Sequence, residues 1–160
     1  MHGRGNCHRG QGLRRKHEHF VEVPLNLRVT WNPARIVGVR AMDDQHAIMM
    51  ETMNELRLAL VQGVRRAPAN ELLDKLLEFT RLHFWNEEQL LERHGFPGLE
   101  AHRAEHRRLL EQITESAHRV QHSESLPIGD LLTFLHDWFI NHVEEVDRQY
   151  GPWMNEREVY

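Results

Sequence analysis

Cysteine is almost absent from this sequence of 160 residues, in which Cys7 is the only one. A single thiol cannot form an internal disulfide, which excludes a disulfide-stapled scaffold and is typical of a reducing cytoplasm. Apolar runs are also short. None approaches the roughly 18 residues that a membrane span needs, and the N-terminus has no apolar signal-peptide core. We therefore expect a cytoplasmic protein with no membrane span.

An excess of basic residues is absent too. The chain has 20 Lys and Arg against 24 Asp and Glu, which gives a net charge of -4 at pH 7. Nucleic-acid-binding proteins usually show the opposite balance and a clustered basic face, so we expect no nucleic-acid partner. Histidine, by contrast, is abundant, with 13 residues in one small protein. Histidine is the commonest metal ligand, so the positions of these residues matter.

The N-terminal part differs in composition from the rest of the chain. Residues 1–24 are rich in Gly, His and Arg without an apolar period, which predicts a mobile tail; a weak metal-binding role of its histidines is the alternative. Residues 25–160 are predicted to form one domain. Within it, Leu27–Met42 contains Pro33 and Gly38 and is interpreted as an ordered arm that crosses the domain, not as a helix.

Apolar residues recur every three or four positions over most of the remaining chain, which predicts helices with one buried face. "HGFPG" interrupts the pattern, because Gly95 and Gly98 end helices and Pro97 cannot continue one. Four helices joined by short connections predict an all-α, up-down-up-down four-helix bundle with an N-terminal arm. The predicted helices run from Asp43 or Asp44 to Gly63, from the end of "APAN" to His94, from Leu99 to His122 and from Pro127 to Tyr150.

Polar residues occupy part of the inward-facing stripe of every helix. Residues four apart share a helix face, so His83 can meet Glu87, and His102 can meet His106. In the fourth helix, inward Val146 is followed by Asp147, which lies about 140° around a regular helix from His142. One such pair alone is usually solvated, but the coincidence recurs at a similar depth in four helices. The seven candidates are His46, His83, Glu87, His102, His106, His142 and Asp147.

A metal would explain these buried polar groups. An unpaired buried carboxylate costs several kcal/mol and an unsatisfied imidazole about 1–3 kcal/mol, so seven would exceed a typical stability of about 5–15 kcal/mol. Five imidazoles and two carboxylates are too many ligands for one tetrahedral zinc ion, but they suit two metals with bridging carboxylates. The lack of sulfur favours iron or manganese over copper(I) or zinc.

Three segments that carry these residues resemble the hemerythrins, specifically the single-domain bacterial ones. They are "W…VGVRAMDDQH", "HFWNEEQLLERHGFPGLEAHRAEH" and "DWFINHVEEVDRQYGP", and the resemblance covers about Trp31 to Tyr150. It implies a cofactor of two iron ions, bridged by an oxo or hydroxo group, with an open position for O2 on one iron. By resemblance, one iron is held by His102, His106 and His142, the other by His46 and His83, and both by Glu87 and Asp147.

The resemblance also implies an apolar pocket at the open position. Many relatives have Leu where Phe139 stands, so this bulkier ring is expected to narrow the pocket. Nearby, the Asp43–Gln45 segment is expected to cap the first helix and to hydrogen-bond a ligand, whereas Glu88, Glu144 and Glu145 are expected to be solvated. The expected pocket residues are Met49, Phe84, Trp138, Phe139 and Val143.

By resemblance, the function is reversible binding of O2 for storage, delivery or sensing, and not catalysis. Two ferrous ions, two carboxylates and one hydroxide sum to about +1, whereas ferritin-like sites use four carboxylates. Fewer anionic ligands favour release of O2 over its activation. NO and an oxygen-using enzyme are candidate partners, and a monomer is expected. The alternative is a diiron enzyme on the same scaffold, such as a peroxidase, an oxidase or an NO-handling protein; the cost of burial disfavours a metal-free interaction protein.

Overall fold

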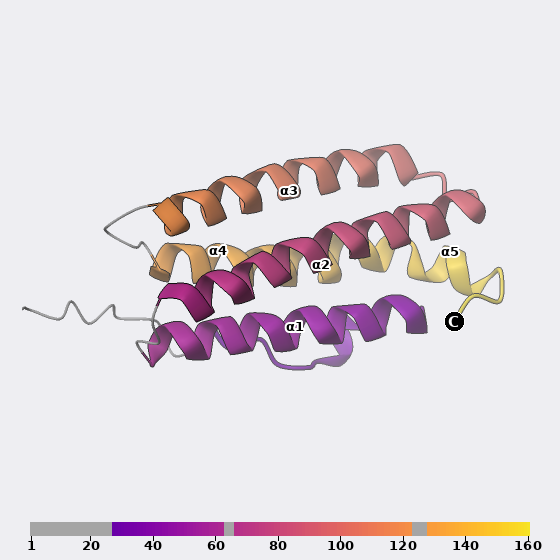
Figure 1. Cartoon of the computed structure of the whole chain (residues 1–160). Coiled ribbons are helices and arrows are strands. Elements are labelled where there is room, and N and C mark those ends of the chain that lie inside the picture. Colours follow the sequence, from indigo (N-terminus) through magenta and orange to yellow (C-terminus); the bar gives the residue numbers. More distant parts are fainter. Residues whose placement is uncertain (1–26, 63–65, 123–127) are drawn as a thin grey trace, which may run out of the picture.

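Four antiparallel helical segments form the protein, as predicted (Figure 1). The computed structural model describes residues 27–62, 66–122 and 128–160, so the predicted tail of residues 1–24 lies outside the described residues. The described part contains no β-strand, and none of its helices is both long and apolar enough to cross a membrane. The long helices are α1 (Arg40–Val61), α2 (Arg66–Arg93), α3 (Leu99–His122) and α4 (Ile128–Asn141).

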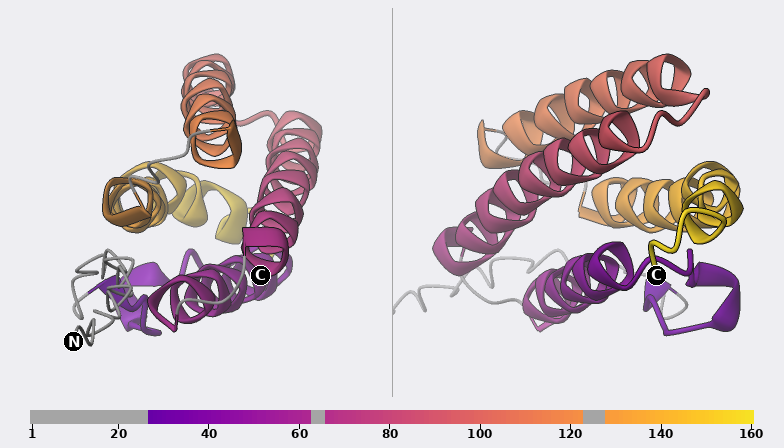
Figure 2. Two further views of the ribbon diagram at one scale, coloured as in Figure 1. Left: turned by 60° about the vertical axis from the view of Figure 1, so that its left-hand side comes forward. Right: turned by 90° about the vertical axis from the view of Figure 1, so that its right-hand side faces the viewer.

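The four long helices are arranged around a common axis, as Figure 2 shows, and their buried side chains form one core. Contacts join α1 to α2, α2 to α3, α3 to α4 and α4 back to α1, which closes the bundle. The core half near the end of α1 and the start of α2 is apolar, with Leu56, Leu76, Ile113 and Leu135 at most 1% exposed. Burial of each such side chain contributes about 1.5–3 kcal/mol, so this half stabilises the fold without any bound group.

The start of α1 differs from the prediction. The helix begins at Arg40, not at Asp43 or Asp44, and no side chain caps its first turn. The Asp43 carboxylate instead accepts hydrogen bonds from the backbone N–H groups of Val37 and Gly38, at 2.8 and 3.1 Å. Gly38 has a φ of +86°, in the left-handed region that glycine adopts at little cost. Asp43 therefore anchors the segment before the helix, from a position inside the helix.

The predicted start of α2 also lies farther along the chain than its observed start. It begins at Arg66, before "APAN", because a proline is tolerated in the first turn of a helix, where its missing N–H would have no partner. Its end at Arg93 is within one residue of the prediction. Gly95 follows with a φ of +64°, and the N–H of Phe96 donates to the carbonyl of Leu91 at 3.0 Å. This hydrogen bond closes the helix end in a conformation that favours glycine. The bounds of α3 agree with the prediction.

The fourth segment is not the continuous helix that the sequence predicted. After α4 ends at Asn141, the chain forms η3 (His142–Val146), a single π-helical turn, and then η4 (Asp147–Gln149), a 3-10 turn. A short helix, α5 (Gly151–Asn155), completes the segment. A π-turn contains one residue more than an α-turn, so the residues after it are rotated relative to α4.

The predicted arm is present, although its last residues, from Arg40, belong to α1. It contains η2 (Pro33–Arg35) and packs two buried valines, Val37 and Val39, against the bundle. Both backbone groups of Val29 bond to the side chain of Asn54, at 3.0 and 2.7 Å. Farther along, the Arg35 guanidinium pairs with Glu144 of η3 at 2.9 Å. Glu144 is thus part of an ion pair with the arm, which corrects its predicted solvated position.

The contact between the arm and α5 predicts a sensitive position. In a Gly151→Ala variant, the added Cβ would lie 2.2 Å from the carbonyl oxygen of Val37. Because that atom is backbone, neither element can move away by a simple side-chain rotation. We expect the free energy of unfolding, measured by urea denaturation, to fall by about 1–3 kcal/mol. Gly98→Ala is the matched control, since its Cβ meets only the ring of Phe96. Equal losses in both variants would contradict this explanation.

Candidate metal centre

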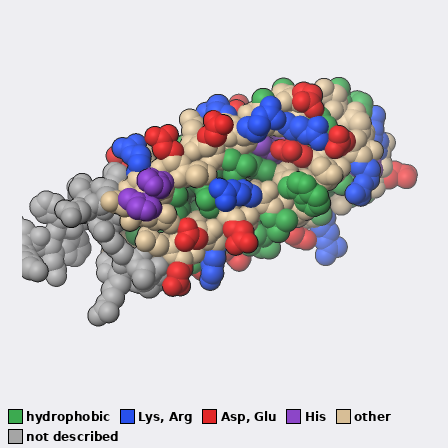
Figure 3. Space-filling view, turned by 45° about the horizontal axis from the view of Figure 1, so that its top comes forward, with side chains coloured by type: hydrophobic (Ala, Val, Ile, Leu, Met, Phe, Trp, Pro, Cys, Tyr) green, Lys and Arg blue, Asp and Glu red, His purple; other side chains and the backbone are tan. Residues whose placement is uncertain are grey.

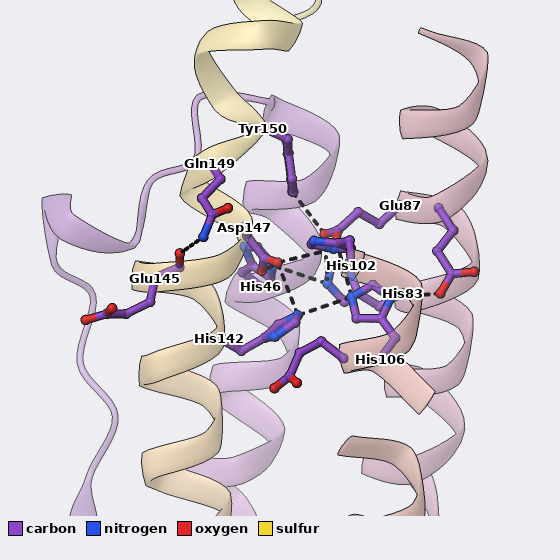
Figure 4. Close-up of polar contacts among 12 residues, drawn as sticks. His46, His83, Glu87, His102, His106, His142, Glu145, Asp147, Gln149 and Tyr150 are labelled. Carbon is purple, nitrogen blue, oxygen red and sulfur yellow. Dashed lines mark hydrogen bonds and ion pairs between the residues drawn. The ribbon is translucent and has the colours of Figure 1, made fainter. Parts of the chain in front are cut away.

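All seven predicted ligand candidates converge inside the bundle (Figure 4). Each of them is at most 4% exposed. Thr80 is also buried, and its hydroxyl donates to the carbonyl of Leu76 at 2.8 Å. His94, His118, His122 and His136 lie outside the cluster, as predicted. Most buried polar side chains in the described part of the chain therefore lie in this cluster.

The first group of ligand atoms contains three imidazoles. The Nε2 atoms of His106 and His142 are 3.2 Å apart, and His142 Nε2 lies 3.1 Å from Asp147 Oδ1. His102 Nε2 contacts Glu87 Oε1, which is also 3.4 Å from His106 Nε2. One atom from each of these five side chains lies within 4.8 Å of the others. Such a group can surround one metal ion.

The second group contains two imidazoles and the same two carboxylates. The Nε2 atoms of His46 and His83 are 3.2 Å apart. The carboxylates turn their other oxygens to this group, because His46 Nε2 lies 3.2 Å from Asp147 Oδ2 and His83 Nε2 lies 3.5 Å from Glu87 Oε2. Glu87 and Asp147 thus each offer one oxygen to either group, which is the arrangement of a bridging carboxylate.

The donor set fits a pair of metal ions. Two nitrogens at right angles, each about 2.1 Å from a metal, would be separated by about 3.0 Å, close to both Nε2–Nε2 distances. Asp147 is fully buried, and among the described residues only the ring nitrogens of His46, His102 and His142 lie within 4 Å of its oxygens, without good hydrogen-bond geometry. A bound cation would remove the cost of that arrangement. Nitrogen and oxygen donors without sulfur suit iron or manganese.

The charges in the metal-free cluster depend on one another. Burial favours the neutral form of Glu87, but hydrogen bonds from His102 and His106 outweigh it and hold the pKa well below its usual range. Burial and the neighbouring Glu87 also oppose ionisation of Asp147, and contacts with His142 and His46 still lower its pKa. The same contacts raise the pKa values of the histidine partners. The pKa of His102 is raised by Glu87, and that of His46 by Asp147, in each case against burial.

The π-turn brings the two ligand candidates of the fourth segment together. In a regular helix, His142 and Asp147 would point about 140° apart. In η3, the N–H of Asp147 donates to the carbonyl of His142, five residues back, so the two side chains lie on one side of the turn. Val146 was predicted to face the core, but it is half-buried, and Asp147 is fully buried in its place. The five-residue separation was the only signal of this turn in the sequence.

Two ring nitrogens that face away from the cluster have side-chain partners. His83 Nδ1 lies 3.0 Å from Gln45 Oε1, which confirms the predicted hydrogen bond from the Asp43–Gln45 segment. His106 Nδ1 lies 2.8 Å from Glu88 Oε1. Glu88 was predicted to be solvated and is instead held between His106 and Arg103, with its side chain 23% exposed. These partners fix the ring orientation and leave Nε2 directed at the cluster.

Tyr150 contacts the cluster, and the sequence interpretation missed it. Its side chain is fully buried, and its hydroxyl donates to Glu87 Oε2 at 2.9 Å. Burial and the nearby carboxylates raise the pKa of Tyr150 well above its usual value, so the phenol keeps its proton and remains a donor. The contact spans 63 positions in the chain, and no local pattern indicates it.

Apolar side chains close the cluster on one side. The ring of Phe84 stacks on His106 with centroids 3.7 Å apart and lies 5.7 Å from the ring of His83. Phe139 stands edge-on to His46 at 6.2 Å, and Trp138 lies 6.5 Å from His142. The two other expected pocket residues, Met49 and Val143, are also buried.

A surface pocket of about 600 Å³ opens between α3 and α4. It is lined by Trp138 and His142, but by neither His46 nor His83. The pocket therefore reaches the side of the cluster that has three imidazoles and does not open onto the side that has two.

Comparison with known proteins agrees with this site. Residues 37–154 match the family described as "Hemerythrin HHE cation binding domain". The bacteriohemerythrin of Methylococcus capsulatus is 30% identical over 125 residues, which cover 78% of this chain and 95% of that protein. A bacteriohemerythrin of Pseudomonas aeruginosa is 31% identical, covering 76% of this chain and 78% of that one. The crystal structure of a wild-type hemerythrin superposes with a TM-score of 0.71 at 30% identity, covering 78% and 95%.

The chain belongs to the hemerythrin family of cation-binding domains. The sequence resemblance to this family is thereby confirmed, as is the helical bundle. The family is described as one of cation-binding domains, and the buried cluster is suitable for metal binding.

Removal of the phenol hydroxyl should weaken the cluster. Tyr150→Phe takes one donor from a buried carboxylate, and hydrogen bonds to charged groups contribute about 1.5–3 kcal/mol. We expect a loss of that size in the free energy of unfolding of the metal-free protein, measured with urea. We also expect about tenfold weaker metal binding, measured by competition with a chelator. Tyr160→Phe is the matched control, because Tyr160 is 71% exposed. If both variants behave alike, Tyr150 has no special role.

The stability of the metal-free protein should fall in mild acid because of His83. Burial lowers the pKa of His83 to about 3, whereas in the unfolded chain it is near 6.5. Between these values the unfolded chain binds a proton that the folded chain does not. The free energy of unfolding should therefore decrease as the pH falls from 6.5, by up to about 1.4 kcal/mol per pH unit for this group.

Unfolding experiments between about pH 6.5 and 5 test this, because most carboxyl groups of the unfolded chain are still ionised there. His46 and His102 add a slope of opposite sign near pH 6.5 and almost none toward the acid end of this window. Their raised pKa values give a stabilisation that is complete below 6.5 and is lost as the pH rises through the folded-state pKa. A His83→Gln variant should show a flatter dependence, while His136→Gln, which changes a partly exposed histidine, should keep it. Unchanged slopes in both variants would refute the explanation.

Proposed function

We propose that this protein holds two iron ions in the buried cluster and binds O2 reversibly there, for storage, delivery or sensing. One observation carries the proposal. Five imidazoles divide into a group of three and a group of two around carboxylates that both groups share. The unequal division supports a site in which one ion has all its positions filled and the other keeps one for a small ligand. Membership of the hemerythrin family supports the choice of iron and O2.

In this proposal the first ion is bound by His102, His106 and His142 and the second by His46 and His83. Glu87 and Asp147 bind both ions, each through its two oxygens. Two ferrous ions so held would supply the electrons that O2 accepts when it binds and returns when it leaves. The orientation of the rings is set in advance by Gln45, which faces His83, and Glu88, which faces His106.

The small number of anionic ligands supports reversible binding. Glu87 and Asp147 are the only carboxylates among the described residues that take part in these groups. With two carboxylates and one hydroxide, a diferrous centre would carry about +1, whereas the four carboxylates of ferritin-like sites stabilise oxidised iron more strongly. Neutral imidazoles therefore favour return of the electrons. Tyr150 adds to this effect, because its hydrogen bond withdraws charge from Glu87.

The apolar wall supports the same function. Phe139 stands against the ring of His46 in the group of two imidazoles, and Phe84 lies between the two groups, stacked on His106 and 5.7 Å from His83. We propose that they exclude water and protons from a bound small ligand, together with Met49, Trp138 and Val143. Since His46 and His83 are at most 1% exposed and neither lines the pocket between α3 and α4, we propose that a small ligand enters by movement of these apolar side chains. Because the ring of Phe139 is bulky, it should slow both the entry of a small ligand and its release.

The test is reconstitution of the purified protein with Fe(II) under anaerobic conditions. Absorption spectra are then recorded through repeated cycles of air and deoxygenation, and bound iron is measured. We expect two irons per chain and an absorption band that appears with O2 and disappears when O2 is removed. The reason is that the site returns its electrons when the ligand leaves. A His46→Gln variant, which removes one of only two imidazoles from the second group, should lose the reversible band.

The other outcomes identify the alternatives. A band that persists, with consumption of an added reductant, would support a diiron enzyme instead, such as a peroxidase or an oxidase. Failure to take up iron would refute the proposal. His136→Gln is the matched control, because this histidine lies on α4 but outside the cluster.

We further propose that the protein acts as a cytoplasmic monomer, that NO can compete with O2 for the site, and that an oxygen-using enzyme is its partner.

A further inference from the structure

A pair of histidines lies outside the buried cluster, near the C-terminal end of α3. His118 and His122 are one helical turn apart, and both are exposed. Figure 3 shows histidine side chains exposed together near one end of the molecule. At a rise of 1.5 Å per residue, His118 is roughly 18 Å along the helix from His106 of the buried cluster. The proposed function does not use these two residues.

The two rings are stacked face to face, so one of these exposed rings must turn for both Nε2 atoms to face one ion. Their centroids are 4.2 Å apart and their planes differ by only 21°. His122 Nδ1 lies 2.9 Å from the carbonyl oxygen of His118, so Nδ1 carries the proton and donates it. The lone pair of His122 is therefore on Nε2, which points away from the backbone. A hydrogen bond from the other ring nitrogen to a carbonyl is the usual way in which a metal-binding histidine is oriented.

We propose that His118 and His122 form a second metal site, a surface chelate for a divalent transition metal such as Zn²⁺, Ni²⁺ or Cu²⁺. Histidines four apart on a helix can bind one ion, as they do in the helix of zinc metalloproteases. Among the described residues, no further His, Cys, Asp or Glu joins this pair to make a group of three. Two nitrogens without a carboxylate suit zinc, nickel or copper better than magnesium, calcium or manganese.

The surface site differs from the buried cluster in its affinity for metal and in how readily the bound ion exchanges. With two protein ligands, the remaining positions of the ion are taken by water, so the ion binds more weakly than in a site with more protein ligands. Because both histidines are exposed, the ion can enter and leave without any movement of the bundle. The site thus takes up metal in response to the free concentration around the protein. Its existence does not depend on iron or O2 binding in the cluster.

The experiment uses the full-length protein with its buried cluster already filled with iron and with excess metal removed. Zinc is then added in steps, and the ring nitrogens are followed by ¹H–¹⁵N NMR. We expect Nε2 of both His118 and His122 to shift together at one equivalent, in parallel with binding heat measured by calorimetry. Iron content, measured before and after, separates this site from the cluster. If the cluster takes up no iron, the titration is continued on the apoprotein beyond the zinc that the cluster binds, and the ring signals of His118 and His122 identify the zinc bound at this site.

Matched variants decide the assignment. His118→Gln and His122→Gln should each weaken the zinc affinity of this site by about tenfold or more, because each removes half of the chelate. His94→Gln and His136→Gln should leave the affinity unchanged, since each changes a single partly exposed histidine. The proposal is overturned if the two ring signals do not move, or if zinc binds equally well to the His118→Gln and His122→Gln variants. In the latter case zinc binds at other histidines of the chain.

Discussion

The sharing of two buried carboxylates between two sets of imidazoles is the constraint on which the rest of the structure depends. Glu87 and Asp147 come from α2 and from the segment after α4, and each must face both sets at once. This requirement fixes the rotation of every helix about its own axis. Neither carboxylate could move by one helical position without losing one set. The bundle is thus more tightly specified here than apolar packing alone would require.

The cost of this arrangement is offset in the other half of the bundle. There the core is made of leucine and isoleucine, including Leu56, Leu76 and Ile113, which need no partner beyond close packing. The arm adds a third contribution, because Arg35 holds η3 and Val29 holds α1. A chain divided in this way can fold on its apolar half and keep its polar half in place for a metal.

Much of the fold and the cluster could be predicted because the signals are local. The bounds of α3 follow from apolar residues that recur every three or four positions between Gly98 and a change of composition after His122. The pairs of His83 with Glu87 and of His102 with His106 follow from their four-residue spacing. The start of α1 could not be predicted, since Asp43 has the composition of a cap but bonds to the segment before the helix. Glu88 and Tyr150 were missed for another reason. Their partners are on other elements, and a sequence pattern does not show which side chain lies across a core.

The π-turn η3 has a consequence for protein engineering. Because it contains one residue more than an α-turn, the fourth segment has two amphipathic faces that are out of phase: one ends at His142, and the other begins at Asp147. A designer who copies residues 128–150 onto a straight helical scaffold would therefore transplant one ligand or the other, but never both. Deletion of a single residue between them would instead convert the π-turn into an α-turn and give the two ligands the four-residue spacing that keeps them on one face of a straight helix. The spacing in this short stretch is thus as much a part of the site as the side chains themselves.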